Sequence, residues 1–271
     1  MFKNYLNLIR MGQWYKNILI FLPLIFAPQT AHSWPLLILG FLGFSCVSSM
    51  TYIINDWVDR EEDKRHPLKK ERPLASGAIS GKTAFLVSIL LMITVSGVTF
   101  KLGLFFGAIV ATYFILTNAY SFKLKHIPLL DIFLIAFNFI LRTLAGLTEL
   151  PNAEVAPYFA AVFALIIMMI TFKRRGDNQI MGKKAASHKP VLKFYTPTKT
   201  SILIGGAWAL WITTIYLTKE FNQFGAATIV LITTNYFFVH KPSLAVKPKL
   251  LLKEWPWVLI LITAIAYLVI S

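Results

Sequence analysis

The sequence is poor in cysteine and in charged residues. Its 271 residues include one cysteine, Cys46, inside an apolar run, which excludes a small scaffold held by disulfide bonds. Only 14% of the residues are charged, against about 25% in a soluble domain. The hydrophobic share is 56% and the mean hydropathy is +0.64. This composition excludes a disordered chain, collagen and a coiled coil, and it indicates a membrane protein.

Several motifs and patterns are also missing. The chain has no Walker A sequence, no G-x-S-x-G and no G-x-G-x-x-G, and it contains no internal repeat. Four of the five histidines, His66, His126, His188 and His240, show no spacing typical of metal ligands. The segment Phe2–Tyr15 resembles an interfacial helix more than a signal peptide, because no small-residue cleavage site follows it.

Acidic residues are scarce, since 12 Asp and Glu face 27 Lys and Arg. In a soluble protein this balance would suggest a nucleic-acid partner. Apolar runs of membrane-spanning length predict nine helices instead. They are centred on Ile18–Thr30, Pro35–Ile54, Ala84–Phe100, Leu102–Asn118, Leu129–Thr148, Pro157–Phe172, Ile202–Thr218, Phe224–Val239 and Pro256–Ile270.

The basic residues follow this topology. Nine spans place 24 of the 27 Lys and Arg on one face, whereas Lys101 and Lys219 fall on the other and Arg142 lies within a span. By the positive-inside rule the 24-residue face is cytoplasmic, and so is the N-terminus. We therefore drop the nucleic-acid interpretation and predict an all-α, polytopic membrane protein. Two long cytoplasmic loops, 57–83 and 173–200, are the expected place for polar chemistry.

An acidic motif ends the second span. Asn55, Asp59 and Asp63 are spaced i, i+4 and i+8, and Asp56 precedes Asp59 by three residues, so a continuing helix would place them on one face. Crowded carboxylate and amide oxygens suit Mg²⁺, which proteins bind through one or two carboxylates plus substrate phosphates. The alternative is a solvated acidic helix end. Basic residues follow, among them Arg72, and the mixture favours a Mg²⁺-diphosphate ligand.

Ionisable residues also occur in and after the fifth and sixth spans. Asp131 and Arg142 are eleven residues apart, or about 16 Å along a helix, so they share a face without pairing directly. Charges at membrane depth normally mark a site or a buried pair, and Arg142 could alternatively bridge helices. After the sixth span, Lys173 or Arg174 could bind phosphate, with Asp177 one turn later.

These residues resemble a known family. Asn-Asp-x-x-Asp-x-x-x-Asp after the second of nine spans, followed by Arg72-Pro73-Leu74-x-Ser76-Gly77, is similar to the UbiA superfamily of intramembrane prenyltransferases. The resemblance covers residues 1–271 as one integral membrane domain. It implies an enzyme of the plasma membrane with its active site on the cytoplasmic side.

The chain departs from most of that family after the sixth span. Most members carry a second Asp-x-x-x-Asp pair there, but here Met181 stands four residues after Asp177. Four other blocks resemble the decaprenyl-phosphate phosphoribosyltransferase branch, although that branch usually has Glu at the position of Asp177. The blocks are Arg10-x-x-Gln13-Trp14-x-Lys16-Asn17, Tyr120-Ser121-x-x-Leu124-Lys125, Asp131 with Leu141-Arg142-x-x-Ala145-Gly146, and Lys173-Arg174-x-x-Asp177.

The resemblance implies a Mg²⁺-dependent transfer of a phosphoribosyl group from 5-phosphoribosyl diphosphate to a polyprenyl phosphate. The expected metal ligands are Asn55, Asp56, Asp59 and Asp63, the three aspartates being catalytic together with Asp131. The expected substrate ligands are Lys16, Asn55, Arg72, Tyr120, Lys125, Arg142, Lys173, Arg174 and Asp177. Within this set Asp131 would position the ribose and Arg142 the acceptor phosphate. The alternatives are a prenyltransferase acting on an aromatic acceptor and a non-catalytic lipid or solute carrier; homo-oligomerisation is left open.

Overall fold

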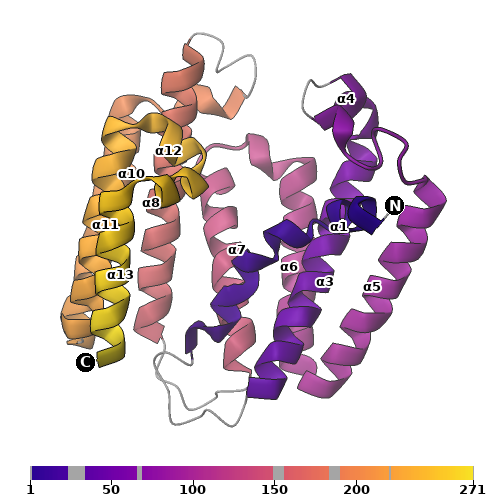
Figure 1. The fold of residues 1–271 in the computed structure, drawn as a ribbon, viewed down its shortest axis with the longest axis horizontal. Helices are drawn as coiled ribbons and strands as arrows, with labels where there is room; N and C mark the ends of the chain where they lie inside the picture. Colours follow the sequence, from indigo (N-terminus) through magenta and orange to yellow (C-terminus); the bar gives the residue numbers. More distant parts are fainter. Residues whose placement is uncertain are drawn as a thin grey trace. The chain divides into compact units, whose positions relative to one another are not determined.

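The computed structural model describes residues 2–23, 34–65, 69–148, 156–182, 190–219 and 221–270. Across these ranges the chain forms helices and no strand, which confirms the all-α prediction. The chain divides into two compact units (Figure 1). Unit 1 comprises Met1–Leu124 with Phe137–Val155, and unit 2 comprises Lys125–Ala136 with Ala156–Ser271.

Unit 1 is built around the long helix α3 (Trp34–Val58), which packs against α5 (Gly81–Leu102), α6 (Leu104–Phe122) and the 3-10 helix η1 (Met11–Phe21). The short helices of this unit are α1 (Phe2–Leu8), α4 (Arg60–Arg65) and η3 (Lys69–Glu71). Buried Phe44 and Phe106 belong to its core. Gly103 ends α5 and begins α6 with a φ of 90°, a conformation that glycine adopts without strain, so the two helices follow each other closely.

Unit 2 pairs α8 (Ala156–Met181) with α10 (Pro197–Thr218), and α11 (Phe221–His240) with α13 (Trp255–Ile270). Thr196 caps α10 by accepting a hydrogen bond from the Lys199 amide, and Pro197 occupies the first turn, where it is tolerated. The connecting helices are η6 (Pro190–Phe194), α12 (Pro242–Val246) and η7 (Pro248–Lys253). After η4 (Leu124–His126), α7 (Leu130–Leu147) starts in unit 2 and ends in unit 1.

Eight of the nine predicted spans coincide with one of these helices. The first, Ile18–Thr30, overlaps the end of η1, and its residues 24–30 lie outside the described ranges. Within the described ranges, five helices are long and apolar enough to cross a membrane, namely α3, α5, α6, α7 and α10. Shorter apolar helices cover Phe224–His240 and Trp255–Ala264. Large apolar side chains are exposed on these helices, Phe100 and Leu104 among them, as expected for surfaces that face lipid.

Candidate functional site

The acidic motif lies where α3 passes into α4. Asp59 separates the two helices, yet the hydrogen-bond pattern of a helix continues through it. The Asp59 amide donates to the Asn55 carbonyl at 2.9 Å, and the Asp63 amide donates to the Asp59 carbonyl at 2.8 Å. The motif therefore keeps helical spacing along its length.

The four motif residues separate into two pairs. Asn55 donates from Nδ2 to Oδ2 of Asp59 at 3.0 Å, which joins the i, i+4 pair. Asp56 and Asp63 are buried, and both accept from Nη1 of Arg72, at 2.9 Å and 2.7 Å. Lys69 Nζ lies 3.6 Å from the other oxygen of Asp63. Two carboxylates of unit 1 thus share one guanidinium group.

The segment after η3 explains how Arg72 reaches both carboxylates. Leu74 is buried in a small cluster with Leu8 and Ile53, and its carbonyl accepts from Arg60 Nε at 3.0 Å. Gly77 has a φ of 76°, a left-handed conformation that favours glycine. The Arg-Pro-Leu-x-Ser-Gly sequence is therefore an anchored turn that fixes the start of the Arg72 side chain.

A second arginine, Arg10, which we had not predicted as a site residue, binds the Asp56 carboxylate. Arg10 lies between α1 and η1, and its Nη2 donates to Asp56 Oδ1 at 2.5 Å. Its guanidinium group also lies over the Tyr52 ring, 4.6 Å from the centroid. The only signal in the sequence was the position of Arg10 at the head of the first block that resembles the phosphoribosyltransferase branch.

A polar cavity of about 260 Å³ opens beside these groups. Its lining comprises Asn7, Arg10, Asp56, Glu71, Arg72 and Pro73. The cavity combines two arginines with a buried carboxylate, a combination that suits a phosphate group carrying a divalent ion.

The residues present fit Mg²⁺ bound through few protein ligands. Asp63 Oδ1 is buried and accepts no hydrogen bond from the described residues; it faces a cation, Lys69 Nζ, at 3.6 Å. In the same ranges no group of three or more His, Cys, Asp or Glu side chains converges in a way that could hold a metal. Two carboxylates completed by substrate phosphates match the way Mg²⁺ is commonly bound.

Unit 2 holds a separate buried cluster around Asp131. This carboxylate is fully buried and accepts from Nε of Arg174 at 3.0 Å, while Arg174 Nη2 lies 3.0 Å from the same oxygen. Its other oxygen accepts from the hydroxyl of Tyr195, and that hydroxyl accepts from the Leu129 amide at 3.0 Å. Burial and the Asp131 hydrogen bond raise the pKa of Tyr195 well above its usual range, so the hydroxyl stays protonated.

This cluster distinguishes the two candidate phosphate ligands of α8. Arg174 is buried and committed to Asp131, whereas Lys173 is exposed. Asp177 Oδ2 lies 3.9 Å from Arg174 Nη1, and Lys125 is half-buried in η4. Of the two candidates, Lys173 is therefore the one exposed to a soluble ligand.

Arg142 bridges helices, as in the alternative that the sequence left open. It is buried, and its guanidinium group donates to Asn17 Oδ1 at 2.8 Å, to the Asn138 carbonyl at 2.5 Å and to the Tyr113 hydroxyl at 3.0 Å. Its partners are neutral oxygens from η1, α7 and α6. The other two candidates of unit 1, Lys16 on η1 and Tyr120 near the end of α6, are half-buried.

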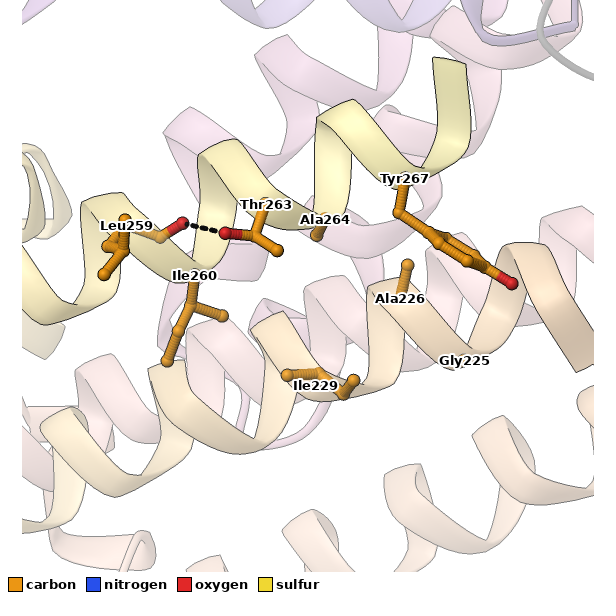
Figure 2. A pocket seen from close by; sticks show the side chains of 8 residues that line it. All are labelled: Gly225, Ala226, Ile229, Leu259, Ile260, Thr263, Ala264 and Tyr267. Atoms are coloured by element: carbon orange, nitrogen blue, oxygen red, sulfur yellow. Dashed lines mark hydrogen bonds between the residues drawn. The ribbon is translucent and has the colours of Figure 1, made fainter. Parts of the chain in front are cut away.

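Apolar cavities also occur in each unit. In unit 2 a pocket of about 510 Å³ lies between α11 and α13, lined by small and apolar side chains around Ala226, Ile229 and Ile260 (Figure 2). The Thr263 hydroxyl donates a hydrogen bond to the Leu259 carbonyl of its own helix. In unit 1 an apolar groove of about 540 Å³ follows α3 and α5, including Ile53 and Phe85. The unit 2 pocket has no charged lining residue, which suits a hydrocarbon chain and excludes a phosphate.

Comparison with known proteins settles the family. Residues 17–253 match the UbiA prenyltransferase family. The chain belongs to the UbiA prenyltransferase family. It is accordingly a multi-pass membrane protein, in agreement with its apolar helices.

Individual relatives add detail. The chain is 34% identical over 189 residues to the uncharacterized protein y4nM of Sinorhizobium fredii, covering 69% of this chain and 36% of that one. It is 29% identical over 197 residues to the decaprenyl-phosphate phosphoribosyltransferase of Corynebacterium glutamicum, covering 70% and 59%. The matches thus span about a third to three-fifths of these relatives' length. A UbiA homolog from Archaeoglobus fulgidus, solved with DMAPP and Mg²⁺, shares the fold with a TM-score of 0.68, 23% identity and coverage of 98% and 97%.

Proposed function

We propose that this UbiA-family protein transfers the 5-phosphoribosyl group of 5-phosphoribosyl diphosphate to a polyprenyl phosphate, with Mg²⁺, at the cytoplasmic face of the plasma membrane. The observation that carries the proposal is the excess of cations on the acidic motif. Arg10, Arg72 and Lys69 surround the carboxylates of Asp56 and Asp63. A donor with a diphosphate and a separate 5-phosphate needs more basic groups than a prenyl diphosphate does.

Two further facts support this donor. Met181 replaces the acidic residue expected four positions after Asp177, so the second carboxylate pair of most UbiA enzymes is missing. The relative from Corynebacterium glutamicum is named a decaprenyl-phosphate phosphoribosyltransferase. Both favour one metal-binding motif combined with a basic phosphate site.

In the proposed mechanism Asn55, Asp56, Asp59 and Asp63 would hold Mg²⁺, and the bound ion would supply positive charge to the leaving diphosphate. Arg72 and Lys16 bind donor phosphates and keep the diphosphate oriented. Tyr120 and Lys125 bind at the rim of the donor site, and Lys173 is the further phosphate ligand that we propose on α8.

The chemical step needs no general base. An oxygen of the acceptor phosphate forms a bond to the anomeric carbon, the bond from that carbon to the diphosphate oxygen breaks, and the diphosphate leaves with the electron pair. No proton has to be removed from the acceptor, because a phosphate monoester is anionic near neutral pH. The arginines stabilise the charge that gathers on the leaving group.

The test is a membrane assay with radiolabelled 5-phosphoribosyl diphosphate and polyprenyl phosphate. We expect a lipid-soluble, Mg²⁺-dependent product that falls at least 100-fold in Asp63→Asn, because the variant removes a ligand charge from the metal motif. Glu62→Gln changes the neighbouring exposed acid and should retain activity. Transfer only from a prenyl diphosphate to an aromatic acid would refute the proposal, and so would uptake into proteoliposomes without product.

A further inference from the structure

The Asp56 carboxylate is bound by more cationic groups than are required to neutralise it. Its Oδ1 atom accepts from Arg72 Nη1 at 2.9 Å and from Arg10 Nη2 at 2.5 Å. Arg72 also serves Asp63, so a single guanidinium group already bridges the two carboxylates. Arg10 is therefore a second cation on an oxygen that has one.

The backbone around Arg10 is fixed on unit 1. Trp14 Nε1 donates to Ser49 Oγ at 3.1 Å, and Asn17 Nδ2 donates to Ser45 Oγ at 2.9 Å, so two bonds hold η1 on α3. Arg10 itself has a φ of 47°, a left-handed conformation that costs an arginine about 1–2 kcal/mol. Such residues persist where the surrounding structure holds them, and they cluster at binding sites and switch regions.

The Arg10 side chain, in contrast, has room to move. Its side chain is 24% exposed and it lines the 260 Å³ polar cavity with Asn7 and Glu71. A long side chain on a fixed backbone can change its hydrogen-bond partner without any movement of the helix. The cavity is where a phosphate group would meet it.

A divalent ion and Arg10 compete for the same oxygen. Asp56 Oδ1 already accepts hydrogen bonds from two guanidinium groups. A metal ion bound to this oxygen would lie close to both of them, and the positive charges would repel each other strongly. A phosphate in the cavity reverses this balance, because it offers Arg10 a new anionic partner.

We propose that Arg10 is a substrate-binding residue that exchanges Asp56 for the donor diphosphate and so makes divalent-ion binding depend on the donor. Without diphosphate Arg10 holds Asp56 and keeps the affinity for the ion low. With diphosphate Arg10 turns to the phosphate oxygens and Asp56 is released to the ion. The inference rests on the proposed function only in requiring a donor that carries a diphosphate.

The experiment measures binding of Mn²⁺ to the purified full chain by electron paramagnetic resonance, with and without inorganic diphosphate. We expect the wild-type chain to bind Mn²⁺ at least tenfold more tightly when diphosphate is present. Arg10→Gln should bind Mn²⁺ alone at least tenfold more tightly than the wild type does, and its gain from diphosphate should fall below threefold. Arg65→Gln removes an exposed arginine of α4 and should behave like the wild type.

Equal affinity of wild type and Arg10→Gln for Mn²⁺ alone would overturn the inference. Arg10→Lys keeps the positive charge and should stay within threefold of the wild type. If the Gln variant unfolds, the wild type still decides, because a gain in Mn²⁺ affinity below threefold on adding diphosphate would overturn the inference. Neither Mn²⁺ nor diphosphate reports on the ribosyl group. A failure of phosphoribosyl transfer with the expected binding pattern would therefore reject the proposed function and leave this inference standing.

Discussion

Individual residues in the acidic motif pair by helical phase. The spacing predicts Asn55, Asp56, Asp59 and Asp63 on one face of a helix. Within that set, Asp63 shares Arg72 with Asp56, and Asn55 pairs with Asp59. The reason is geometric: seven residues make almost two full turns, whereas eight overshoot by about 80°. Residue types were thus predictable from the sequence. The partner of each carboxylate was not, because Arg72 and Arg10 arrive from distant segments.

Arg72 is expected to be the residue on which this pairing depends. Arg72→Met leaves two buried carboxylates without their bridging cation, and we expect the free energy of unfolding to fall by about 3 kcal/mol. The measurement is reversible unfolding in a defined detergent. Adding Asp63→Asn to Arg72→Met should restore part of the loss, whereas Arg65→Met, at an exposed site, should change little. A double variant less stable than Arg72→Met would contradict the charge argument.

At the level of elements, the N-terminal segment differs most from expectation. We predicted an interfacial helix over Phe2–Tyr15, but the structure has α1, a left-handed break at Arg10 and an eleven-residue 3-10 helix. Such long 3-10 helices are uncommon and indicate that tertiary contacts decide the backbone. One such contact is the close approach of the Ile20 carbonyl to Gly146 on α7. Sequence periodicity carries no information about a contact 126 residues away.

Substitution of Gly146 tests the close contact between η1 and α7. A Cβ atom added there would stand 1.9 Å from the Ile20 carbonyl oxygen, so Gly146→Ala forces η1 and α7 apart. We expect a loss of about 3 kcal/mol in unfolding free energy and a loss of transfer activity, since η1 carries Lys16 and follows Arg10. Gly205→Ala is the matched control: it has no neighbour within 4 Å in α10, and alanine favours a helix by up to about 1 kcal/mol. Equal stability of the two variants would refute the close contact.

In unit 2 a contact between distant segments is made by Tyr195, which no pattern in the sequence predicted. Its hydroxyl links the start of α7, through Asp131 and the Leu129 amide, to the segment that follows η6. Leu129 has a φ of 66°, so the bond also holds a strained residue. The Asp131 prediction concerned ribose binding and stays a prediction; the contacts described here tie Asp131 to the fold.

Tyr195→Phe removes the hydroxyl and keeps the ring. The variant leaves the partly buried Leu129 amide and an oxygen of the buried Asp131 carboxylate each short of a partner, and we expect an unfolding free energy lower by about 2–3 kcal/mol. Tyr216→Phe on α10 makes the same chemical change at a side chain that is 74% exposed and should be neutral. The measurement is thermal unfolding of both variants under the same conditions. A loss of stability in Tyr195→Phe but not in Tyr216→Phe shows that the Tyr195 hydroxyl stabilises the fold.

For the molecule as a whole, composition was the strongest predictor. Apolar runs located eight helices because membrane spans need only length and hydropathy, which are local properties. Several of the polar contacts inside each unit join residues far apart in the chain, such as Arg142 and Asn17, 125 positions apart, and these followed from no local pattern. The side of the membrane on which each loop lies stays a prediction from the basic residues.

The membrane topology can be measured with cysteines introduced one at a time. The native sequence has one cysteine, Cys46, so a single substitution gives a cysteine-free background. In a Cys46→Ala background we expect cysteines at Lys82 and Lys123 to react with a membrane-impermeant thiol reagent only from the cytoplasmic side. Cysteines at Lys101 and Lys219 should react only from the opposite side. Labelling of Lys82 and Lys101 from the same side would disprove the assignment of the span between them.

The placement of α7 across both units has a consequence for synthesis. Arg142, near its end, binds Asn17 and Tyr113, which leave the ribosome before it does. Asp131, near its start, binds Arg174 and Tyr195, which are made 43 and 64 residues later. At roughly 5–20 residues per second, the carboxylate waits about 3–13 s for Tyr195. During that interval α7 is satisfied at one end only, and membrane insertion has to shelter an unpaired aspartate until the second unit is made.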